Sequence, residues 1–214
     1  MDPPIAAILL SAGRSERMGA FKPLLPFGPH TVLEACVDYL LPVLEPIVVV
    51  IGPGRHELRT KLQAKPVIIV ENPDPASEMG QSIACGVRAL PAGTEAVVIA
   101  LVDHPAIPSH VVQRLIDEWK SGARLVVPTW QGRGGHPVLV DLQFRAELLA
   151  LPTETGLKSL FQTYAPEVRR VPVDSPFIAR DMDTWDDYTR LYLDVFGERP
   201  PNNEESNESP GPAI

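Results

Sequence analysis

Cysteine is scarce in this sequence: Cys36 and Cys85 are the only two among 214 residues. They form no Cys-x-x-Cys pair, so a thiol–disulfide motif is not expected, and we expect both to be free core thiols. Long apolar runs are also missing, because runs such as Ile5–Leu10 fall far short of the roughly 20 residues that span a bilayer. The chain does not open with the basic segment of a signal peptide. These absences predict a cytoplasmic protein with no membrane partner.

Positive charge is in deficit, with 19 Lys and Arg against 27 Asp and Glu and a net charge of −8. Such a chain is not expected to bind nucleic acid, because the phosphate backbone attracts basic surfaces. Its length suits one domain, which we expect over residues 1–197. Residues 198–214 are acidic, rich in proline and almost without residues that could pack, which predicts a disordered tail.

Several well-known catalytic motifs are absent as well. No Gly-Lys-Ser/Thr or Gly-x-Ser-x-Gly sequence occurs, which argues against a P-loop NTPase and a serine hydrolase. The segment Gly52-Pro53-Gly54 lacks the third glycine of a dinucleotide fingerprint, because Glu57 occupies that position, so a Rossmann oxidoreductase is not expected. The histidines, His104 and His110 among them, lack the spacing of zinc ligands.

Short apolar runs alternate with helical patterns along the rest of the chain. Five runs rich in β-branched residues are expected to be strands covered on both faces: Ile5–Leu10, Ile47–Ile51, Val67–Val70, Ala96–Val102 and Leu125–Val127. Helical spacing relates Met79, Ile83, Val87 and Leu90, then Val111, Val112, Leu115, Ile116 and Trp119 after Pro108, and finally Tyr188, Leu191, Tyr192, Val195 and Phe196 after an N-cap at Thr184. This order predicts a Rossmann-like open, mostly parallel α/β sheet with helices on both faces, whose ligands bind at the carboxyl ends of the strands.

The loop after the first strand concentrates positive charge in an acidic chain. Arg14, Arg17 and Lys22 lie within nine positions of one another in the segment Ser11 to Pro26, which also carries small residues and glycines. Small residues let backbone N–H groups approach an anion closely, so the loop is a candidate phosphate site. A solvated basic turn is the alternative reading of the same residues.

Acidic residues follow two other segments. Asp103 comes directly after the strand Ala96–Val102 and is a candidate Mg²⁺ ligand, with an Asx-turn or helix cap as the alternative. Asp181 and Asp183 precede the last helix, where Asp186 and Asp187 already suit the helix dipole. That leaves Asp181 and Asp183 with less structural reason to be acidic.

Taken together, these segments resemble the MobA-like nucleotidyltransferase family, and within it the molybdenum cofactor cytidylyltransferases. Four blocks carry the likeness, in the family's order: Leu10 to Gly19 with Lys22; Asn72-Pro73 with Gly80, Gln81, Ser82 and Gly86; Asp103-x-Pro105; and Gly135-His136-Pro137 with Asp181-Met182-Asp183-Thr184-x-x-Asp187-Tyr188. The resemblance implies a fold of the nucleotide-diphospho-sugar transferase type. It also implies Mg²⁺-dependent transfer of a nucleotide to a phosphomonoester, with release of pyrophosphate.

The resemblance also assigns roles to individual residues. Arg17, Lys22 and Asp103 are implied as catalytic, and Asp103, Asp181 and Asp183 as metal ligands. The resemblance assigns nucleotide binding to a larger set of residues: Leu10, Ser11, Ala12, Gly13, Arg14, Lys22, Asn72, Gly80 and Ser82. The acceptor side falls to Gly135, His136 and Pro137, for which a plain glycine-rich connection is an equal alternative.

Substrate choice rests on one position. The opening Leu10-Ser11-Ala12-Gly13 has alanine where guanylyltransferases of the family usually have glycine, which favours CTP over GTP. The implied acceptor is molybdenum cofactor, with a molybdenum hydroxylase as the partner that receives the product. Two alternatives stay open: a nucleotidyltransferase for a sugar phosphate or other small phosphomonoester, and a non-catalytic carrier of the cofactor.

Overall fold

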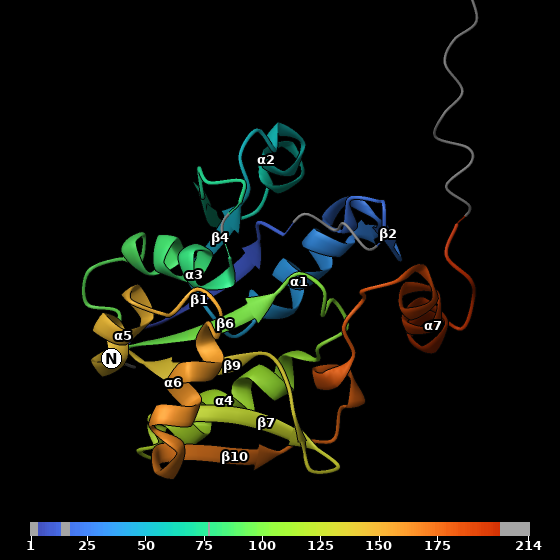
Figure 1. The fold of residues 1–214 in the computed structure, drawn as a ribbon. Helices are drawn as coiled ribbons and strands as arrows, with labels where there is room; N and C mark the ends of the chain where they lie inside the picture. Colours follow the sequence, from blue (N-terminus) through green and yellow to red (C-terminus); the bar gives the residue numbers. More distant parts are fainter. Residues whose placement is uncertain (1–3, 14–17, 77, 202–214) are drawn as a thin grey trace, which may run out of the picture.

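The structure is a computed structural model that describes residues 4–13, 18–76 and 78–201. Its centre is an open, mixed and mostly parallel sheet with the strand order β10-β7-β9-β6-β1-β4-β5, and β8 pairs with β7 (Figure 1). The strands are β1 (Ile5–Ser11), β4 (Ile47–Ile51), β5 (Val67–Glu71), β6 (Ala96–Leu101), β7 (Leu125–Trp130), β8 (Arg133–Gly134), β9 (Val138–Asp141) and β10 (Val168–Pro172). A separate hairpin is formed by β2 (Pro26–Phe27) and β3 (His30–Thr31).

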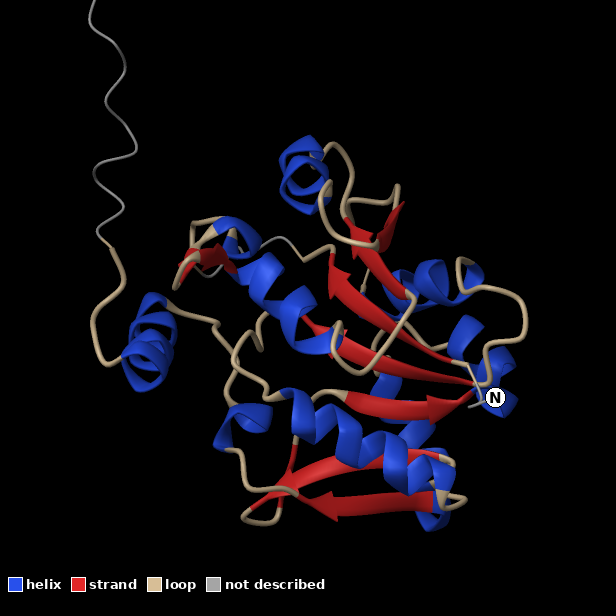
Figure 2. Ribbon diagram, turned by 180° about the vertical axis from the view of Figure 1, so that it is seen from behind, coloured by secondary structure: helices blue, strands red, loops and turns tan. Residues whose placement is uncertain are grey.

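Helices cover both faces of this sheet, which confirms the expected architecture (Figure 2). The α-helices are α1 (Val32–Leu40), α2 (His56–Leu62), α3 (Met79–Arg88), α4 (Ser109–Lys120), α5 (Arg145–Leu149), α6 (Leu157–Thr163) and α7 (Trp185–Phe196). Four 3₁₀ turns are η1 (Lys22–Leu24), η2 (Leu142–Phe144), η3 (Ala165–Glu167) and η4 (Pro176–Ala179). One buried core joins α1, α2 and α4 to the sheet, and a second joins α3, α5 and α6 to the opposite face.

Helix α7 packs away from the sheet. Its residues Tyr188, Leu191 and Tyr192 form a third buried cluster with Phe27 of the β2–β3 hairpin, and the Tyr188 hydroxyl donates to Pro26 O at 2.7 Å. Thr184 caps the helix as predicted, with Asp187 completing the capping box. The helix therefore fastens the carboxyl-terminal segment beside the start of the chain's first helix, α1.

One detail of the sequence interpretation was wrong. The run Val67–Val70 is not covered on both faces, because β5 is the edge strand of the sheet and is only partly buried. Met79 lies in a helix as its spacing predicts, but it is 43% exposed, because it lies in the first turn of α3. Val195 and Phe196 are also exposed, since the last turn of α7 extends past the small cluster that the helix covers.

The strand directions decide where a ligand can bind. Strands β6, β1, β4 and β5 are parallel neighbours, so their carboxyl ends meet at one edge of the sheet. Strand β9 runs antiparallel to β6, which brings the residues before β9 to that same edge. Loops from five strands thus converge there, as expected for an open α/β sheet. Across the described residues, no helix is both long enough and apolar enough to traverse a bilayer.

Candidate active site at the carboxyl ends of the strands

The loop after β1 begins at the centre of this edge. Leu10 and Ser11 end the strand as buried residues, and Ala12 and Gly13 continue outwards with increasing exposure. A Cβ atom built on Gly13 has no neighbour within 4 Å, so packing against the described residues does not require glycine here. The predicted phosphate contacts Arg14 and Arg17 lie outside the described residues.

Lys22 returns from this loop to the edge through the turn η1. Its Nζ lies 2.8 Å from Asp183 Oδ1, although the two residues are 161 positions apart. Only 10% of the lysine side chain is exposed, and an ammonium group that is so buried requires a negative partner. The structure therefore brings together a predicted phosphate-binding cation and a predicted metal ligand.

Asp103 stands at the end of β6 beside the same pair. Its carbonyl oxygen accepts a hydrogen bond from Met182 N at 3.1 Å, which ties the Asp103 turn to the Asp181–Asp183 segment. Burial raises the pKa of the Asp103 carboxyl, the charges of His104 and Lys22 lower it, and those of Asp181 and Asp183 raise it again, with a net upward shift. The predicted acids from two remote segments thus act on one another electrostatically.

The carboxylate of Asp103 retains capacity for a ligand. Its Oδ1 atom is buried without a hydrogen-bond partner among the described residues, and His104 Nε2 lies 3.6 Å away. Within the described ranges no three His, Cys, Asp or Glu side chains form a ready metal cluster. Mg²⁺ typically takes one or two carboxylates and completes its shell with substrate phosphates and water, so a strand-end carboxylate such as that of Asp103 suits that ion without a preformed cage.

Asn72 and Ser82 form a second polar pair, on the β5 side of the edge. Asn72 Nδ2 donates to Ser82 Oγ at 3.0 Å, and both residues are buried. Strand β5 lies three strand intervals from β6, roughly 14 Å at ordinary spacing, so a ligand that reaches both Asn72 and Asp103 must cross β4 and β1. Gly80, predicted to contact the nucleotide, has a separate packing reason to be glycine, because a Cβ there would lie 3.2 Å from Leu151 Cβ.

The Gly135-His136-Pro137 segment reaches the edge on the other side of Asp103. Gly135 packs so closely on η4 that a Cβ would lie 1.9 Å from Ile178 O, and His136 N donates to that oxygen at 2.8 Å. The His136 ring lies 5.7 Å from the His104 ring, centroid to centroid. Burial, followed by the charge of His104, lowers the pKa of His136 to about 4, so its ring is neutral at pH 7.

Sequence reasoning missed the part played by His104 and η4. His104, considered only as a zinc ligand, lies between Asp103 and His136, and its Nδ1 is 3.3 Å from Phe177 O. Turn η4 holds both His104 and His136 through backbone carbonyl groups. A signal was present, because His104 directly follows the candidate metal ligand, but the role of η4 depends on a tertiary contact.

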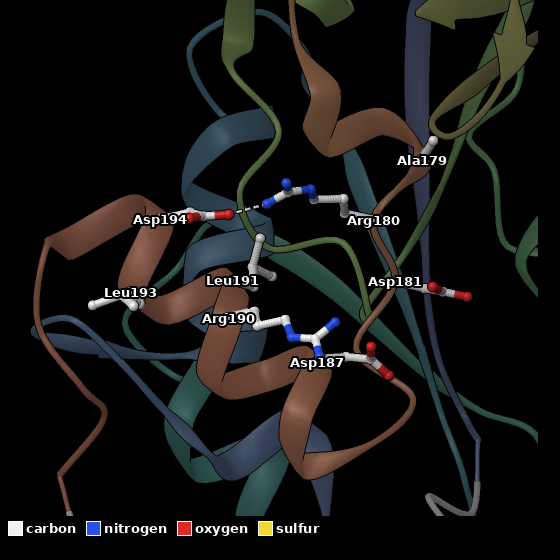
Figure 3. A pocket seen from close by; sticks show the side chains of 8 residues that line it. All are labelled: Ala179, Arg180, Asp181, Asp187, Arg190, Leu191, Leu193 and Asp194. Carbon is white, nitrogen blue, oxygen red and sulfur yellow. Dashed lines mark hydrogen bonds and ion pairs between the residues drawn. The ribbon is translucent and has the colours of Figure 1, made fainter.

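A shallow cavity of about 360 Å³ lies between the 179–181 segment and α7 (Figure 3). It is bordered by the ion pair between Arg180 and Asp194. The side chain of Asp181 points away from this ion pair (Figure 3), and Asp187 Oδ2 already accepts two hydrogen bonds from Thr184. Of the acids assigned to the metal, Asp181 is one of the residues that line this cavity.

A parallel α/β edge with a glycine-containing loop, a buried lysine and a strand-end carboxylate has the groups that nucleotidyl transfer requires, and a nucleotidyltransferase is the class that the family match gives. The chain belongs to the MobA-like NTP transferase family, since the model described as "MobA-like NTP transferase domain" matches residues 7–169.

Curated relatives of similar length are named for different activities. The chain is 26% identical to the molybdenum cofactor cytidylyltransferase of Escherichia coli K12, over 86% of this chain and 93% of that protein. It is 27% identical to the nicotine blue oxidoreductase of Paenarthrobacter nicotinovorans, over 88% and 97%. It is 28% identical to a probable molybdenum cofactor guanylyltransferase of Mycobacterium bovis, over 80% and 86%.

Solved structures agree on the fold. The crystal structure of Rv0371c from Mycobacterium tuberculosis H37Rv matches with a TM-score of 0.78 and 28% identity, covering 88% of this chain and 98% of that one. The same mycobacterial protein has been solved in complex with manganese, at a TM-score of 0.76 and 26% identity. The fold is that of the GT-A-like nucleotidyltransferases.

Proposed function

We propose that this nucleotidyltransferase transfers CMP from CTP to the terminal phosphate of molybdenum cofactor, with Mg²⁺ as its metal ion. A phosphate oxygen of the acceptor forms a bond to the α-phosphorus of CTP, the bond from that phosphorus to the bridging oxygen breaks, and pyrophosphate leaves. A phosphate monoester is already anionic near neutral pH, so no protein nucleophile is needed. The observation that carries the proposal is the convergence of Lys22, Asp183 and Asp103 at one edge of the sheet.

The residues of this edge have distinct roles in the proposed reaction. Backbone N–H groups of Ala12 and Gly13 bind the triphosphate, and Lys22 neutralises its charge, assisted by Arg14 and Arg17. Asp103, with Asp181 or Asp183, holds Mg²⁺, which supplies charge neutralisation on the phosphate oxygens when it is bound.

Base and acceptor lie on opposite sides of these charges. Asn72, Gly80 and Ser82 contact the base and ribose, with Leu10 and Ser11 at the floor. Gly135, His136 and Pro137 face the acceptor. Because His136 is neutral at pH 7, it contributes a hydrogen bond to the acceptor and no positive charge.

Ala12 supports the choice of CTP, and relatives named for molybdenum cofactor support the choice of acceptor. Ala12 stands in the loop where a methyl group crowds the base edge of a purine. The cytidylyltransferase of E. coli aligns along nearly the whole chain. The product is then expected to pass to a molybdenum hydroxylase.

Pyrophosphate release tests the proposal. Purified protein is assayed with each of the four NTPs, Mg²⁺, and either molybdenum cofactor or a panel of sugar phosphates. We expect release only with CTP and molybdenum cofactor, and a loss of at least about 100-fold in Asp103→Asn, since charge neutralisation accounts for most catalysis in this chemistry. A preference for GTP overturns the base assignment, and release with sugar phosphates overturns the acceptor.

Two further results would overturn separate parts of this proposal, the metal role of Asp103 and the enzymatic role. One is wild-type turnover by a correctly folded Asp103→Asn protein, which would remove Asp103 from the metal. The other is cofactor binding with no pyrophosphate release under any NTP, which would make the protein a carrier.

A further inference from the structure

Two of the five buried side-chain polar atoms that have no hydrogen-bond partner in the described part of the chain belong to Tyr39 and Asp103. They are the hydroxyl oxygen of Tyr39 on α1 and Oδ1 of Asp103 at the end of β6. Leaving a buried polar group unpaired costs about 1–3 kcal/mol, and a phenylalanine would fill the same space without that cost. The presence of tyrosine at this position, in place of phenylalanine, therefore indicates that its hydroxyl group has a role.

The two atoms belong to the same part of the core. Cys36 and Tyr39 are three residues apart on α1, so they share a face of the helix. Cys36 Sγ lies 3.5 Å from the carbonyl oxygen of Val102, the residue before Asp103. Helical side chains lean toward the amino-terminal end of their helix, so Tyr39 extends back toward Cys36 and the Asp103 turn.

The pKa shifts of Cys36 and Tyr39 agree with a position of both side chains near Asp103. Burial first, and then the negative charge of Asp103, raises the pKa of the Cys36 thiol well above its usual value. Burial, Cys36 and the charge of Asp103 likewise raise the pKa of the Tyr39 hydroxyl. Tyr39 therefore stays protonated at every physiological pH and can act only as a neutral group with one proton to donate.

We propose that Tyr39 is a positioning residue for the metal ligand Asp103. Its hydroxyl group donates a hydrogen bond, through one bridging water molecule, to the buried Oδ1 oxygen of Asp103. The bond fixes the rotation of the carboxylate, so that the other oxygen, Oδ2, is presented to the metal-bound triphosphate. Hydrogen-bonded partners of this kind commonly change metal affinity by about 10–100-fold when they are removed. The inference rests on the metal role of Asp103 in the proposed function.

Direct metal binding tests the inference without relying on turnover. Free Mn²⁺ is followed by electron paramagnetic resonance while the protein is titrated in the presence of a non-hydrolysable CTP analogue. For Tyr39→Phe we expect the Mn²⁺ dissociation constant to rise about 10–100-fold, with an unchanged or higher melting temperature. The matched control is Tyr164→Phe, which removes a hydroxyl that bonds Glu147 at 3.0 Å on another part of the molecule, and it should not change Mn²⁺ affinity.

A kinetic measurement separates positioning from a structural defect. Turnover of Tyr39→Phe should recover toward the wild-type value when Mn²⁺ is raised to saturation, which a damaged fold would not do. Tyr39→Leu serves as a second variant that lacks the hydroxyl, and it should show the same loss of affinity.

The outcomes distinguish this inference from the proposed function. If Asp103→Asn loses Mn²⁺ but Tyr39→Phe binds it as the wild type does, the positioning role is wrong and the metal role of Asp103 stands. If Asp103→Asn binds Mn²⁺ normally, the metal role itself is wrong and the inference falls with it.

Discussion

At the scale of single residues, glycine meets two different requirements around this site. Gly135 is required by packing, because any Cβ there overlaps the backbone of η4. Gly13 is different, since a Cβ at that position meets nothing among the described residues. We propose that glycine is needed here for the close approach of a ligand's phosphate to the backbone.

The first prediction compares these two glycines. Gly13→Ala is expected to change the free energy of unfolding by less than about 0.5 kcal/mol, since no contact is altered. It should raise the KM for CTP about tenfold, because the added methyl group displaces the triphosphate from the backbone N–H groups. Gly135→Ala should instead cost about 3 kcal/mol or more of stability. Urea denaturation and initial rates measure both, and an unchanged KM for Gly13→Ala would remove that residue from the phosphate site.

The second prediction concerns pH and His136, whose pKa burial lowers from 6.5 to about 4. Below pH 6.5 the unfolded chain binds a proton on this ring that the folded protein does not bind, so stability falls as the pH drops toward 4. A shift of this size costs about 2–3 kcal/mol at pH 4.5. Between pH 7 and pH 4.5, the free energy of unfolding of the wild type should therefore fall by about 2–3 kcal/mol more than that of His136→Gln.

Urea denaturation at the two pH values measures this difference. The control is His56→Gln, an exposed histidine at the start of α2. Equal acid sensitivity of the wild type and His136→Gln would show that the ring is solvated in the folded protein.

At the scale of elements, the central strands and their helices follow from the sequence far better than the edges do. The all-apolar run Ile47–Ile51 is a fully buried strand, and Thr184 with Asp187 caps α7 as expected. Apolar residues that follow helical spacing and yet stay exposed, such as Met79, lie where a helix starts or ends, and local periodicity carries no information about what covers those turns. Strand order and the antiparallel direction of β9 depend on tertiary pairing, so the sequence offers candidate residues at strand ends but not the contacts between them.

The third prediction concerns the approach of α3 to the sheet. A Cβ on Gly86 would lie 2.7 Å from Ile8 Cγ2 and 3.1 Å from Val50 Cγ2, so Gly86→Ala should force α3 away from β1. We expect a loss of about 1–3 kcal/mol, although alanine favours helix more than glycine does. Because Ser82 lies on the same helix, the KM for CTP should rise as well.

A double-mutant cycle checks that cause. Combining Gly86→Ala with Ile8→Ala removes the clashing methyl group, so the two stability losses should be less than additive by more than about 0.5 kcal/mol. Arg88→Ala, an exposed substitution on the same helix, controls for helix propensity. Strict additivity would show that Gly86 is not needed for close packing.

At the scale of the whole molecule, the chain's last helix is tied to its beginning. Tyr188, Leu191 and Tyr192 of α7 share a buried cluster with Phe27. Asp183, in the segment before this helix, forms an ion pair with Lys22. Gly197 ends α7 in the left-handed conformation, at φ 74°. The proposed domain boundary at residue 197 therefore coincides with the end of the last helix.

The fourth prediction follows from that boundary. A chain that ends at Gly197 should melt within about 2 °C of the full chain and transfer CMP at the same rate, because residues 198–214 hold little that can pack. A chain that ends at Thr184 should lose most of its stability, since it exposes the cluster that α7 covers. Calorimetry and pyrophosphate release measure both. A large loss on removal of residues 198–214 would show that this segment belongs to the domain.

The hydrogen bond from Met182 N to the Asp103 carbonyl joins two segments that are synthesised at different times. During synthesis, the glycine loop, Lys22 and Asp103 all emerge from the ribosome long before Asp183 does. A nascent chain therefore contains most of the proposed triphosphate site while it still lacks the carboxylate that pairs with Lys22. Under the proposed function, capture of a metal–nucleotide complex has to wait until the Asp181–Asp183 segment has been synthesised.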